Sequence, residues 1–255
     1  MAVIIKSKRE IDLMKKSGEV MIGLHKVLHD FTRPGISTAE LDKIAGRYCA
    51  EHGAIPSSKG YEGYPGNICI SVNDTLVHGI PSKKIVLKEG DIVTYDCLVT
   101  LNGYTTDAAR TWPVGKVSPE AEKLIQTTEK AFFEAVKLIK PGIHLGDVSA
   151  KIQYIAEHEG YSLTDMFTGH GVGREVHEDP YIPNQGRRGT GIILQEGMTL
   201  AIEPMVNLGT KYVEIMEDGW TAKTKDGKIC SHYENTVVVT KDGYEIITLE
   251  KEGEN

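Results

Sequence analysis

The chain has 255 residues, of which 40% are hydrophobic and 25% charged, and 29 Lys and Arg against 36 Asp and Glu give a formal net charge of −7. These values are typical of a globular protein with one large or two small domains, and the excess of acids argues against a DNA-binding protein. No apolar run approaches the roughly 18 to 20 residues that span a bilayer, and neither a secretory signal nor CxxC spacing is present, so we expect a cytoplasmic protein without membrane spans or disulfides.

Helical spacing and turn signals predict two helices and a hairpin in the first half of the chain. Residues 8–31 carry apolar side chains at helical spacing. Ser37 and Glu40 predict a capping box for a second helix that ends near Gly53. Residues 90–112 are expected to form a β-hairpin, because two strand-like runs flank an Asn-Gly turn.

The second half has the same order of elements. A Ser-Pro pair at 118–119 opens one helix, and a second helix begins after the Pro-Gly pair at 141–142 and ends near Gly160. Three strands are expected after these helices, at residues 198–206, 211–216 and 233–240.

An internal repeat relates the two halves. The RPGI sequence at 33–36 recurs as KPGI at 140–143, and the run at 87–96 recurs at 194–203, both at an offset of 107 residues. The alternative is that PG and EG are merely common turn dipeptides, but two matches share one offset. The repeat predicts an α+β fold made of two pseudo-symmetric halves, about 1–115 and 116–255, that together form a single compact domain.

The hairpin places two aspartates on one face. A two-residue turn at 102–103 sets Leu98 opposite Asp107 and Asp96 opposite Ala109. The two aspartates are then diagonal neighbours about 7 to 8 Å apart, close enough to share a metal ion. The alternative is a solvated face on which both are ordinary surface acids.

The repeat adds two further acids. Asp96 corresponds to Glu203, which lies in an apolar strand. Glu234 precedes a run of β-branched residues, much as Asp107 precedes the end of the first hairpin. Four acids related in pairs by a pseudo-twofold axis would converge at that axis. Carboxylates with one imidazole suit Mn, Co, Fe or Zn, whereas carboxylates alone suit Mg or Ca.

Three histidines have unusual surroundings. His170 lies in a glycine-rich TGHGVG segment, His177 follows it by seven residues, and His78 lies in VHGIP. A single histidine is more often a surface or satisfied core residue than a ligand. We interpret the remaining six in that ordinary way: His25, His29, His52, His144, His158 and His232.

The motifs together resemble the type I methionine aminopeptidases over essentially the whole chain. The resemblance rests on GYEGYP at 60–65, NDTLVHGIP at 73–81, the two hairpin aspartates, TGHGVGREVHEDP at 168–180, IEPM at 202–205 and YENT at 233–236. It implies the pita-bread fold, in which two α+β halves surround a curved antiparallel sheet. It also implies that two divalent ions (Co, Mn, Fe(II) or Zn) are held by Asp96, Asp107, His170, Glu203 and Glu234.

The resemblance implies roles for further residues in releasing the N-terminal Met of nascent polypeptides. Asp107 and Glu234 would bridge the two ions, and the hydroxide that the ions generate would attack the first peptide bond. Glu203 would transfer the proton, while His78 and His177 would hydrogen-bond the substrate and the tetrahedral intermediate.

An apolar pocket for the Met side chain is also implied by the resemblance. Its lining would be Tyr61, Tyr64, Cys69 and Trp220, although these residues could equally be plain core. Two positions depart from many relatives, with Ser58 in place of Cys and Val176 in place of Phe. The smaller Val176 could loosen the pocket and relax the preference for Met.

Two alternatives remain open. The same fold and ligands serve X-Pro aminopeptidases and prolidases, and some pita-bread proteins are non-enzymatic binding modules. We expect a monomer without DNA or membrane partners. Transient contact with the ribosome could involve three small basic clusters, at residues 6–9, 187–188 and 223–228, although a solvated surface is the simpler interpretation.

Overall fold

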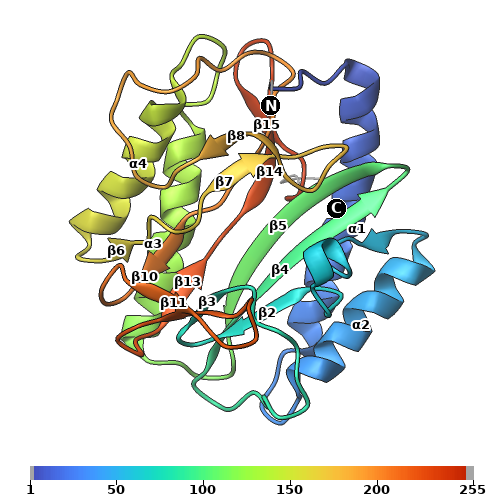
Figure 1. The fold of residues 1–255 in the computed structure, drawn as a ribbon, viewed down its shortest axis with the longest axis vertical. Coiled ribbons are helices and arrows are strands. Elements are labelled where there is room, and N and C mark those ends of the chain that lie inside the picture. The colour runs from blue at the N-terminus through green and yellow to red at the C-terminus, as the bar shows by residue number, and fades with distance from the viewer. Residues whose placement is uncertain (1–2, 251–255) are drawn as a thin grey trace.

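The computed structural model describes residues 3–250, which form four helices that flank several antiparallel sheets (Figure 1). The helices are α1 (Lys8–Phe31), α2 (Thr38–Glu51), α3 (Pro119–Val136) and α4 (Leu145–His158). A short 3-10 helix, η1, spans Tyr61–Gly63. The α+β prediction is therefore confirmed. No helix within the described residues is long and apolar enough to cross a membrane.

The strands fall into four sheets. The first contains β1 (Ile55–Pro56), β2 (Cys69–Val72), β4 (Ile92–Leu101) and β5 (Tyr104–Pro113). The largest has five strands: β7 (Gly169–Gly171), β8 (Glu178–Ile182), β9 (Thr199–Ile202), β14 (Asn235–Val239) and β15 (Tyr244–Ile246). The two smaller sheets comprise β6 (Ser162–Leu163), β10 (Met205–Asn207) and β13 (Cys230–His232), and β3 (Thr75–Val77), β11 (Val213–Ile215) and β12 (Ala222–Thr224).

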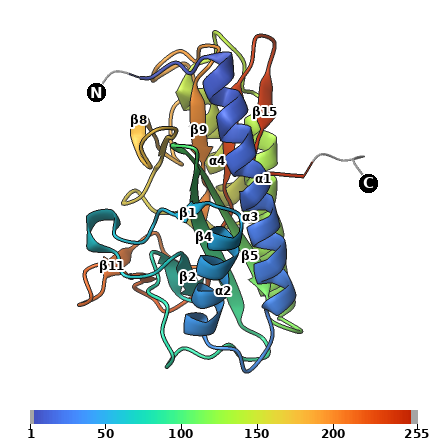
Figure 2. The same cartoon turned by 90° about the vertical axis from the view of Figure 1, so that its right-hand side faces the viewer.

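Each half of the chain has its own hydrophobic core. Met21 and Leu24 of α1 pack with Tyr95 of β4 in the first half, and all three are fully buried. Phe132 of α3 and Val237 of β14 belong to the core of the second half. The helices therefore cover the back of the strands, while η1, β8 and β11 lie on the opposite face (Figure 2). That face is free to carry a site.

The predicted helix starts and the hairpin register are confirmed. Ser37 and Glu40 form both hydrogen bonds of the capping box, and Ser118 caps α3 directly before Pro119. In the β4–β5 hairpin, Leu98 pairs with Asp107 and Asp96 pairs with Ala109. The turn residue Asn102 has φ 54°, the left-handed conformation that the Asn-Gly turn requires.

The turns before α2 and α4 have the same hydrogen bonds at the offset of 107 residues. Gly35 N–H donates to Leu87 O at 2.8 Å, and Gly142 N–H donates to Leu194 O at 2.9 Å. The φ angles of the two glycines are 91° and 90°, which side chains with a Cβ rarely adopt. The repeated sequence thus encodes a repeated turn.

The two halves meet along β5 and β14. Ala109 and Glu234 exchange backbone hydrogen bonds of 3.3 and 2.9 Å. The neighbouring contact joins Asp107, two residues before Ala109, to Thr236, two residues after Glu234. The Thr236 hydroxyl accepts a hydrogen bond from Asp107 N–H and donates one to Asp107 O, both at 2.9 Å. A twofold axis that exchanges Asp107 with Glu234 and Ala109 with Thr236 would map one pair of contacts onto the other.

One predicted strand is wrong in extent. The run at 198–206 is broken after Ile202, so that β9 and β10 belong to different sheets. Pro204 lacks the N–H that a continuous ladder would require. The break leaves Glu203 between the two sheets.

Candidate metal centre and substrate cavity

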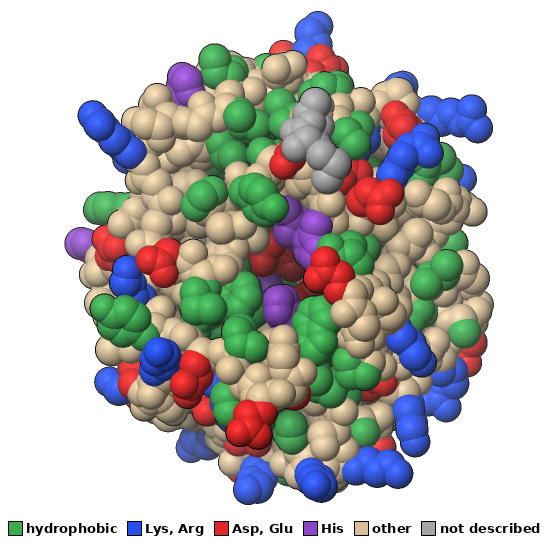
Figure 3. All heavy atoms as spheres, viewed as in Figure 1, with side chains coloured by type: hydrophobic (Ala, Val, Ile, Leu, Met, Phe, Trp, Pro, Cys, Tyr) green, Lys and Arg blue, Asp and Glu red, His purple; other side chains and the backbone are tan. Residues whose placement is uncertain are grey.

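All four predicted acids line one cavity of about 390 Å³, which opens on the face opposite the helices. Asp96 comes from β4 and Asp107 from β5, while Glu203 follows β9 and Glu234 precedes β14. Figure 3 shows acidic and histidine side chains at the bottom of a hollow that is bordered by hydrophobic side chains. Each half of the chain therefore supplies two carboxylates to one place.

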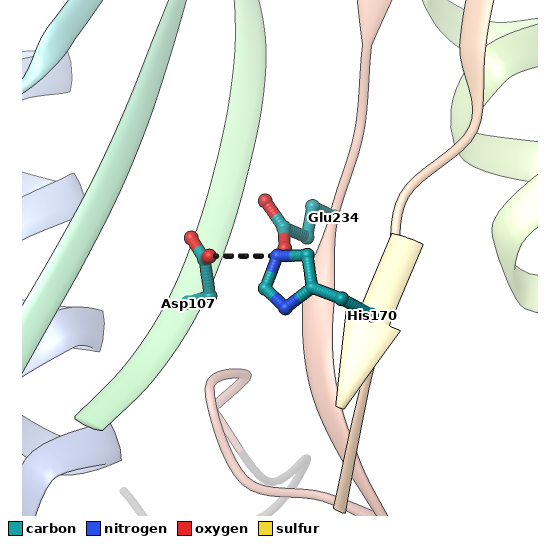
Figure 4. Close-up of side chains that lie close together, drawn as sticks. All are labelled: Asp107, His170 and Glu234. Carbon is teal, nitrogen blue, oxygen red and sulfur yellow. Dashed lines mark ion pairs between the residues drawn. The ribbon is translucent and has the colours of Figure 1, made fainter. Parts of the chain in front are cut away.

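The Nε2 atom of His170, which can coordinate a metal, faces the acidic side chains. Its Nδ1 lies 2.9 Å from Gly171 O, so that Nδ1 carries the proton and donates to the backbone. Its Nε2 lies 3.5 Å from Asp107 Oδ2, as Figure 4 shows. The same nitrogen lies 3.5 Å from Glu203 Oε1. Burial lowers the pKa of His170 to about 4, which keeps the ring neutral and the Nε2 lone pair available near pH 7.

The acids have raised pKa values because they are buried together. Burial raises the pKa of Asp107 to about 8 and raises those of Asp96, Glu203 and Glu234 well above their usual range. Repulsion between the carboxylates adds to the effect for the latter three. No carboxylate here has a lysine or arginine ion pair within the described residues.

The donor set fits divalent metal ions. Asp107 Oδ1 and Glu234 Oε1 are buried oxygens without a hydrogen-bond partner. Ligand atoms of Asp107, His170 and Glu234 lie within 4.8 Å of one another, and so do those of Glu203, His232 and Glu234. Two groups that share Glu234 would accommodate two cations, whose charge would offset the four carboxylates. Asp96 lies in the same cavity but in neither of these two groups.

His232 is a site residue that the sequence analysis missed. It is 1% exposed, and neither ring nitrogen has a hydrogen-bond partner. Its Nε2 lies 3.6 Å from Glu203 Oε2 and 3.8 Å from Glu234 Oε2, and burial lowers its pKa to about 3. The available signal was its spacing of two residues from Glu234, which places both side chains on one face of an extended segment.

His78 and His177 lie at the mouth of the same cavity. His177 Nδ1 is 2.7 Å from the Tyr61 hydroxyl, and its ring packs edge-on against His170 with centroids 4.3 Å apart. His78 packs edge-on against Phe167 and Trp220. Burial lowers the pKa of His78 to about 4. The residue His177 is exposed as a whole, but desolvation of its ring in the cavity wall and repulsion from His170 lower its pKa to about 4 as well, so both rings are neutral near pH 7.

Apolar side chains form the remaining wall. Tyr61, Tyr64, Cys69 and Trp220 all line the cavity, and the rings of Tyr64 and Trp220 pack edge-on at 5.2 Å. The sequence analysis missed Met166, Phe167 and Met205, which also line it. Burial raises the pKa of the Cys69 thiol well above its usual range, which keeps the thiol neutral.

The two positions that depart from many relatives differ in placement. Ser58 lines the cavity, and its buried hydroxyl oxygen has no hydrogen-bond partner. Val176 is half-buried and lies outside the group of described residues that form the cavity wall. The size of Val176 therefore does not set the width of the pocket directly.

One predicted basic cluster is wrong in part. Lys6 is buried and forms an ion pair with Glu178, so only Lys8 and Arg9 of that cluster are exposed. Arg187 and Arg188 are exposed as expected. In the third cluster Lys223 Nζ lies 3.1 Å from Asp74 Oδ1, which partly neutralises it.

Comparison with known proteins gives one consistent result. Residues 12–241 match metallopeptidase family M24. The chain is 50% identical to a methionine aminopeptidase of Clostridium perfringens over 98% of this chain and 100% of that one. It is 41% identical to the methionine aminopeptidase of Escherichia coli K12, over 99% of this chain and 96% of that one.

The solved structures agree. The methionine aminopeptidase of Thermotoga maritima superposes with a TM-score of 0.96 at 43% identity, covering 98% of this chain and 100% of that one. A prolidase of Pyrococcus furiosus superposes with a TM-score of 0.80 at 25% identity, and this chain covers 66% of its length. The pita-bread architecture expected from the sequence is confirmed by these neighbours.

Proposed function

The chain belongs to the methionine aminopeptidases of metallopeptidase family M24, and from this premise we propose how its cavity releases the initiator Met of nascent polypeptides. The observation that carries the proposal is the convergence of four buried carboxylates and His170 beside an apolar pocket. We propose that residues 1–255 act as one catalytic domain and that the two pseudo-symmetric halves share this centre.

We propose that Asp96, Asp107, His170, Glu203 and Glu234 would hold two divalent ions. The unpartnered oxygens of Asp107 and Glu234 support this assignment. When bound, the ions supply Lewis acidity and lower the pKa of water, which makes a nucleophile available near neutral pH. Co, Mn, Fe(II) and Zn all suit carboxylate ligands combined with one imidazole.

Glu203 is proposed to move the proton. Its carboxylate lies at the break between β9 and β10, where it accepts a proton from the attacking water and delivers it to the leaving amine. His232 Nε2 lies 3.6 Å from Glu203 Oε2, so it borders this carboxylate without a direct hydrogen bond. Asn184 fixes the backbone of the same residue by donating to Glu203 O at 2.9 Å.

His177 and His78 are proposed to stabilise the negative charge that develops on the scissile carbonyl oxygen. The Tyr61 hydroxyl can donate to His177 Nδ1, because burial raises the pKa of Tyr61 and keeps its proton in place. His177 Nε2 then carries a proton that can be donated into the cavity. Removing one such donor typically lowers kcat by about 10²- to 10³-fold.

The apolar wall is proposed to bind the Met side chain. Tyr64, Cys69 and Trp220 provide surfaces that suit a thioether. A small second residue of the substrate would lie beside His78 and His177, which line the same cavity. We also propose a cytoplasmic monomer that contacts the ribosome transiently through exposed basic residues such as Arg187 and Arg188.

Peptide hydrolysis by metal-stripped protein titrated with Mn²⁺, Co²⁺, Fe²⁺ or Zn²⁺ tests the proposal. We expect cleavage of Met-Ala-Ser to require metal and to exceed that of Leu-Ala-Ser by at least tenfold, the discrimination that an apolar pocket provides. Equal cleavage of the two peptides would refute the Met pocket, and cleavage without metal would refute the metal centre.

The likeness to a prolidase motivates one further arm of the experiment. Ala-Pro should be a poor substrate compared with Met-Ala-Ser, because the apolar wall fits an extended thioether. Preferential cleavage of Ala-Pro would reassign the chain to an X-Pro peptidase. Co-sedimentation with ribosomes, compared with an Arg187→Glu/Arg188→Glu variant, tests the ribosome contact separately; identical binding would exclude these arginines.

A further inference from the structure

A buried ion pair outside the metal cluster joins the N-terminal segment to the loop that carries His177. Lys6 and Glu178 are in direct contact, and their side chains are 2% and 3% exposed. Buried charges of this kind must be paired, and neither residue has a place in the proposed chemistry. The pair therefore calls for a separate explanation.

Glu178 organises the loop before β8. Its Oε1 accepts hydrogen bonds from Arg174 N–H at 2.8 Å and from Glu175 N–H at 3.3 Å. Its Oε2 faces the Lys6 ammonium. One carboxylate thus closes residues 174–178 into a compact turn, and His177 is the residue directly before it.

Hydrogen bonds to neighbouring backbone groups fix the position of Lys6. Its backbone N–H donates to Gly197 O at 2.8 Å, and its ammonium also donates to Ile4 O at 3.3 Å. The loop packs directly on the lysine side chain, because a Cβ at Gly173 would lie 2.5 Å from Lys6 Cε. Lys6 therefore lies directly against the loop rather than at its edge.

His177 depends on this loop because little else fixes it. The residue is exposed as a whole although it lines the cavity, and within the described residues the aromatic and hydrogen-bond contacts of its ring are with Tyr61 and His170. The start of the loop is fixed by Thr105 N–H, which donates to Gly173 O at 2.7 Å. Glu178 and Lys6 fix its other end.

We propose that Lys6 and Glu178 are positioning residues that set the place of His177 at the mouth of the cavity. The inference rests on the proposed role of His177 in the reaction. Lys6 neutralises and locates the Glu178 carboxylate, the carboxylate holds the turn, and the turn directs the imidazole toward the substrate carbonyl. The N-terminal segment is thereby part of the catalytic apparatus, although it contacts no substrate.

A double-mutant cycle in the metal-loaded protein tests the proposal. Lys6→Met, His177→Ala and the combined variant are compared for kcat and KM on Met-Ala-Ser, with metal content and Tm measured for each. We expect Lys6→Met to lower kcat about tenfold or more while KM changes by less than about threefold, because small displacements of a catalytic group are costly. In the His177→Ala background, Lys6→Met should change kcat by less than about twofold.

Two further variants keep the test decisive. If Lys6→Met does not fold, Lys6→Met/Glu178→Gln leaves no unpaired buried charge and enters the same cycle with the same expectation. Lys15→Met is the matched control, since it breaks the half-exposed ion pair of α1 with Glu245 (2.6 Å) and should leave kcat unchanged.

The outcomes separate the two hypotheses. Equal losses from Lys6→Met in the presence and absence of His177 would refute the positioning role, because the pair would then act on the fold as a whole. Full activity of Lys6→Met/Glu178→Gln would refute it as well. If His177→Ala alone has normal kcat, it is the proposed role of His177 that fails, and the inference fails with it.

Discussion

Replacing Asp107 with Asn should inactivate the protein and yet stabilise its metal-free form. Asp107 is 3% exposed, its Oδ1 has no hydrogen-bond partner, and its pKa is raised to about 8, first by burial. Because the folded protein binds this proton more tightly than the unfolded chain does, stability falls as pH rises from about 4, the unfolded pKa, to about 8. Above about pH 8 the folded protein bears the full loss of stability that comes from ionising the buried Asp107 carboxyl group.

The size of the penalty follows from the pKa. A tenfold change in acid dissociation is worth about 1.4 kcal/mol, so raising the pKa of Asp107 from its ordinary value near 4 to about 8 corresponds to ~5 kcal/mol. In a chain of this length each kcal/mol changes Tm by about 2 to 4 °C. Asn cannot ionise, and its amide can donate to a neighbouring carboxylate. We therefore expect metal-free Asp107→Asn to melt about 10 °C above the metal-free parent at pH 8.

The assay is thermal unfolding of chelator-treated proteins between pH 5 and pH 9. The difference in Tm should shrink toward pH 5, where Asp107 of the parent is protonated in the folded protein. Asp226→Asn is the matched control: hydrogen bonds from the backbone of Thr210 and Lys228 lower the pKa of Asp226, so its neutralisation should not raise Tm. A metal-free Asp107→Asn that melts at or below the parent at pH 8 would refute the reasoning.

Three further predictions concern the pocket, the histidines and the repeat. Trp220→Ala should raise the KM for Met-Ala-Ser about tenfold with a smaller change in kcat, because it removes the pocket ring that packs edge-on against Tyr64. An unchanged KM would contradict this role for Trp220. His78 and His177 have pKa values lowered to about 4, so imidazole NMR at pH 6 should show both rings neutral, and protonated rings would contradict the burial argument. Gly35→Ala and Gly142→Ala should each lower the free energy of unfolding, measured in urea, by about 1 to 2 kcal/mol. The cost comes from backbone strain alone, because the two φ angles are 91° and 90° and an added Cβ would meet no atom within 4 Å. Clearly different losses for the two variants would mean that the two turns are not equivalent.

The hairpin and three of the four acids were predictable from spacing along the chain, whereas Glu234 does not lie at the repeat offset of 107 residues from Asp107. An Asn-Gly turn fixes the strand register, and the register then places Asp96 and Asp107 on one face. The repeat extends the argument to Glu203, since equivalent positions in two pseudo-symmetric halves approach the same axis. These steps need only spacing along the chain.

The misses depend on contacts between distant parts of the chain. Lys6 was expected at the surface because its partner, Glu178, lies 172 residues away in sequence. His232 was grouped with ordinary histidines because its neighbours in sequence are polar, whereas its burial comes from the docking of β13 against other elements. The strand break at Pro204 was readable in principle, since proline cannot continue a central ladder.

The seam between β5 and β14 has a consequence for assembly. Asp96 and Asp107 lie on one side of this seam, and Glu203 and Glu234 lie on the other, so neither half alone carries the complete cluster. Ions bound across the seam would cross-link the two halves, in addition to the apolar clusters that already join them, and would add to folding stability in proportion to the logarithm of metal concentration. Two fragments divided near residue 115 should accordingly associate more tightly when metal is present, as subunits of a dimer do when they share a ligand at their interface.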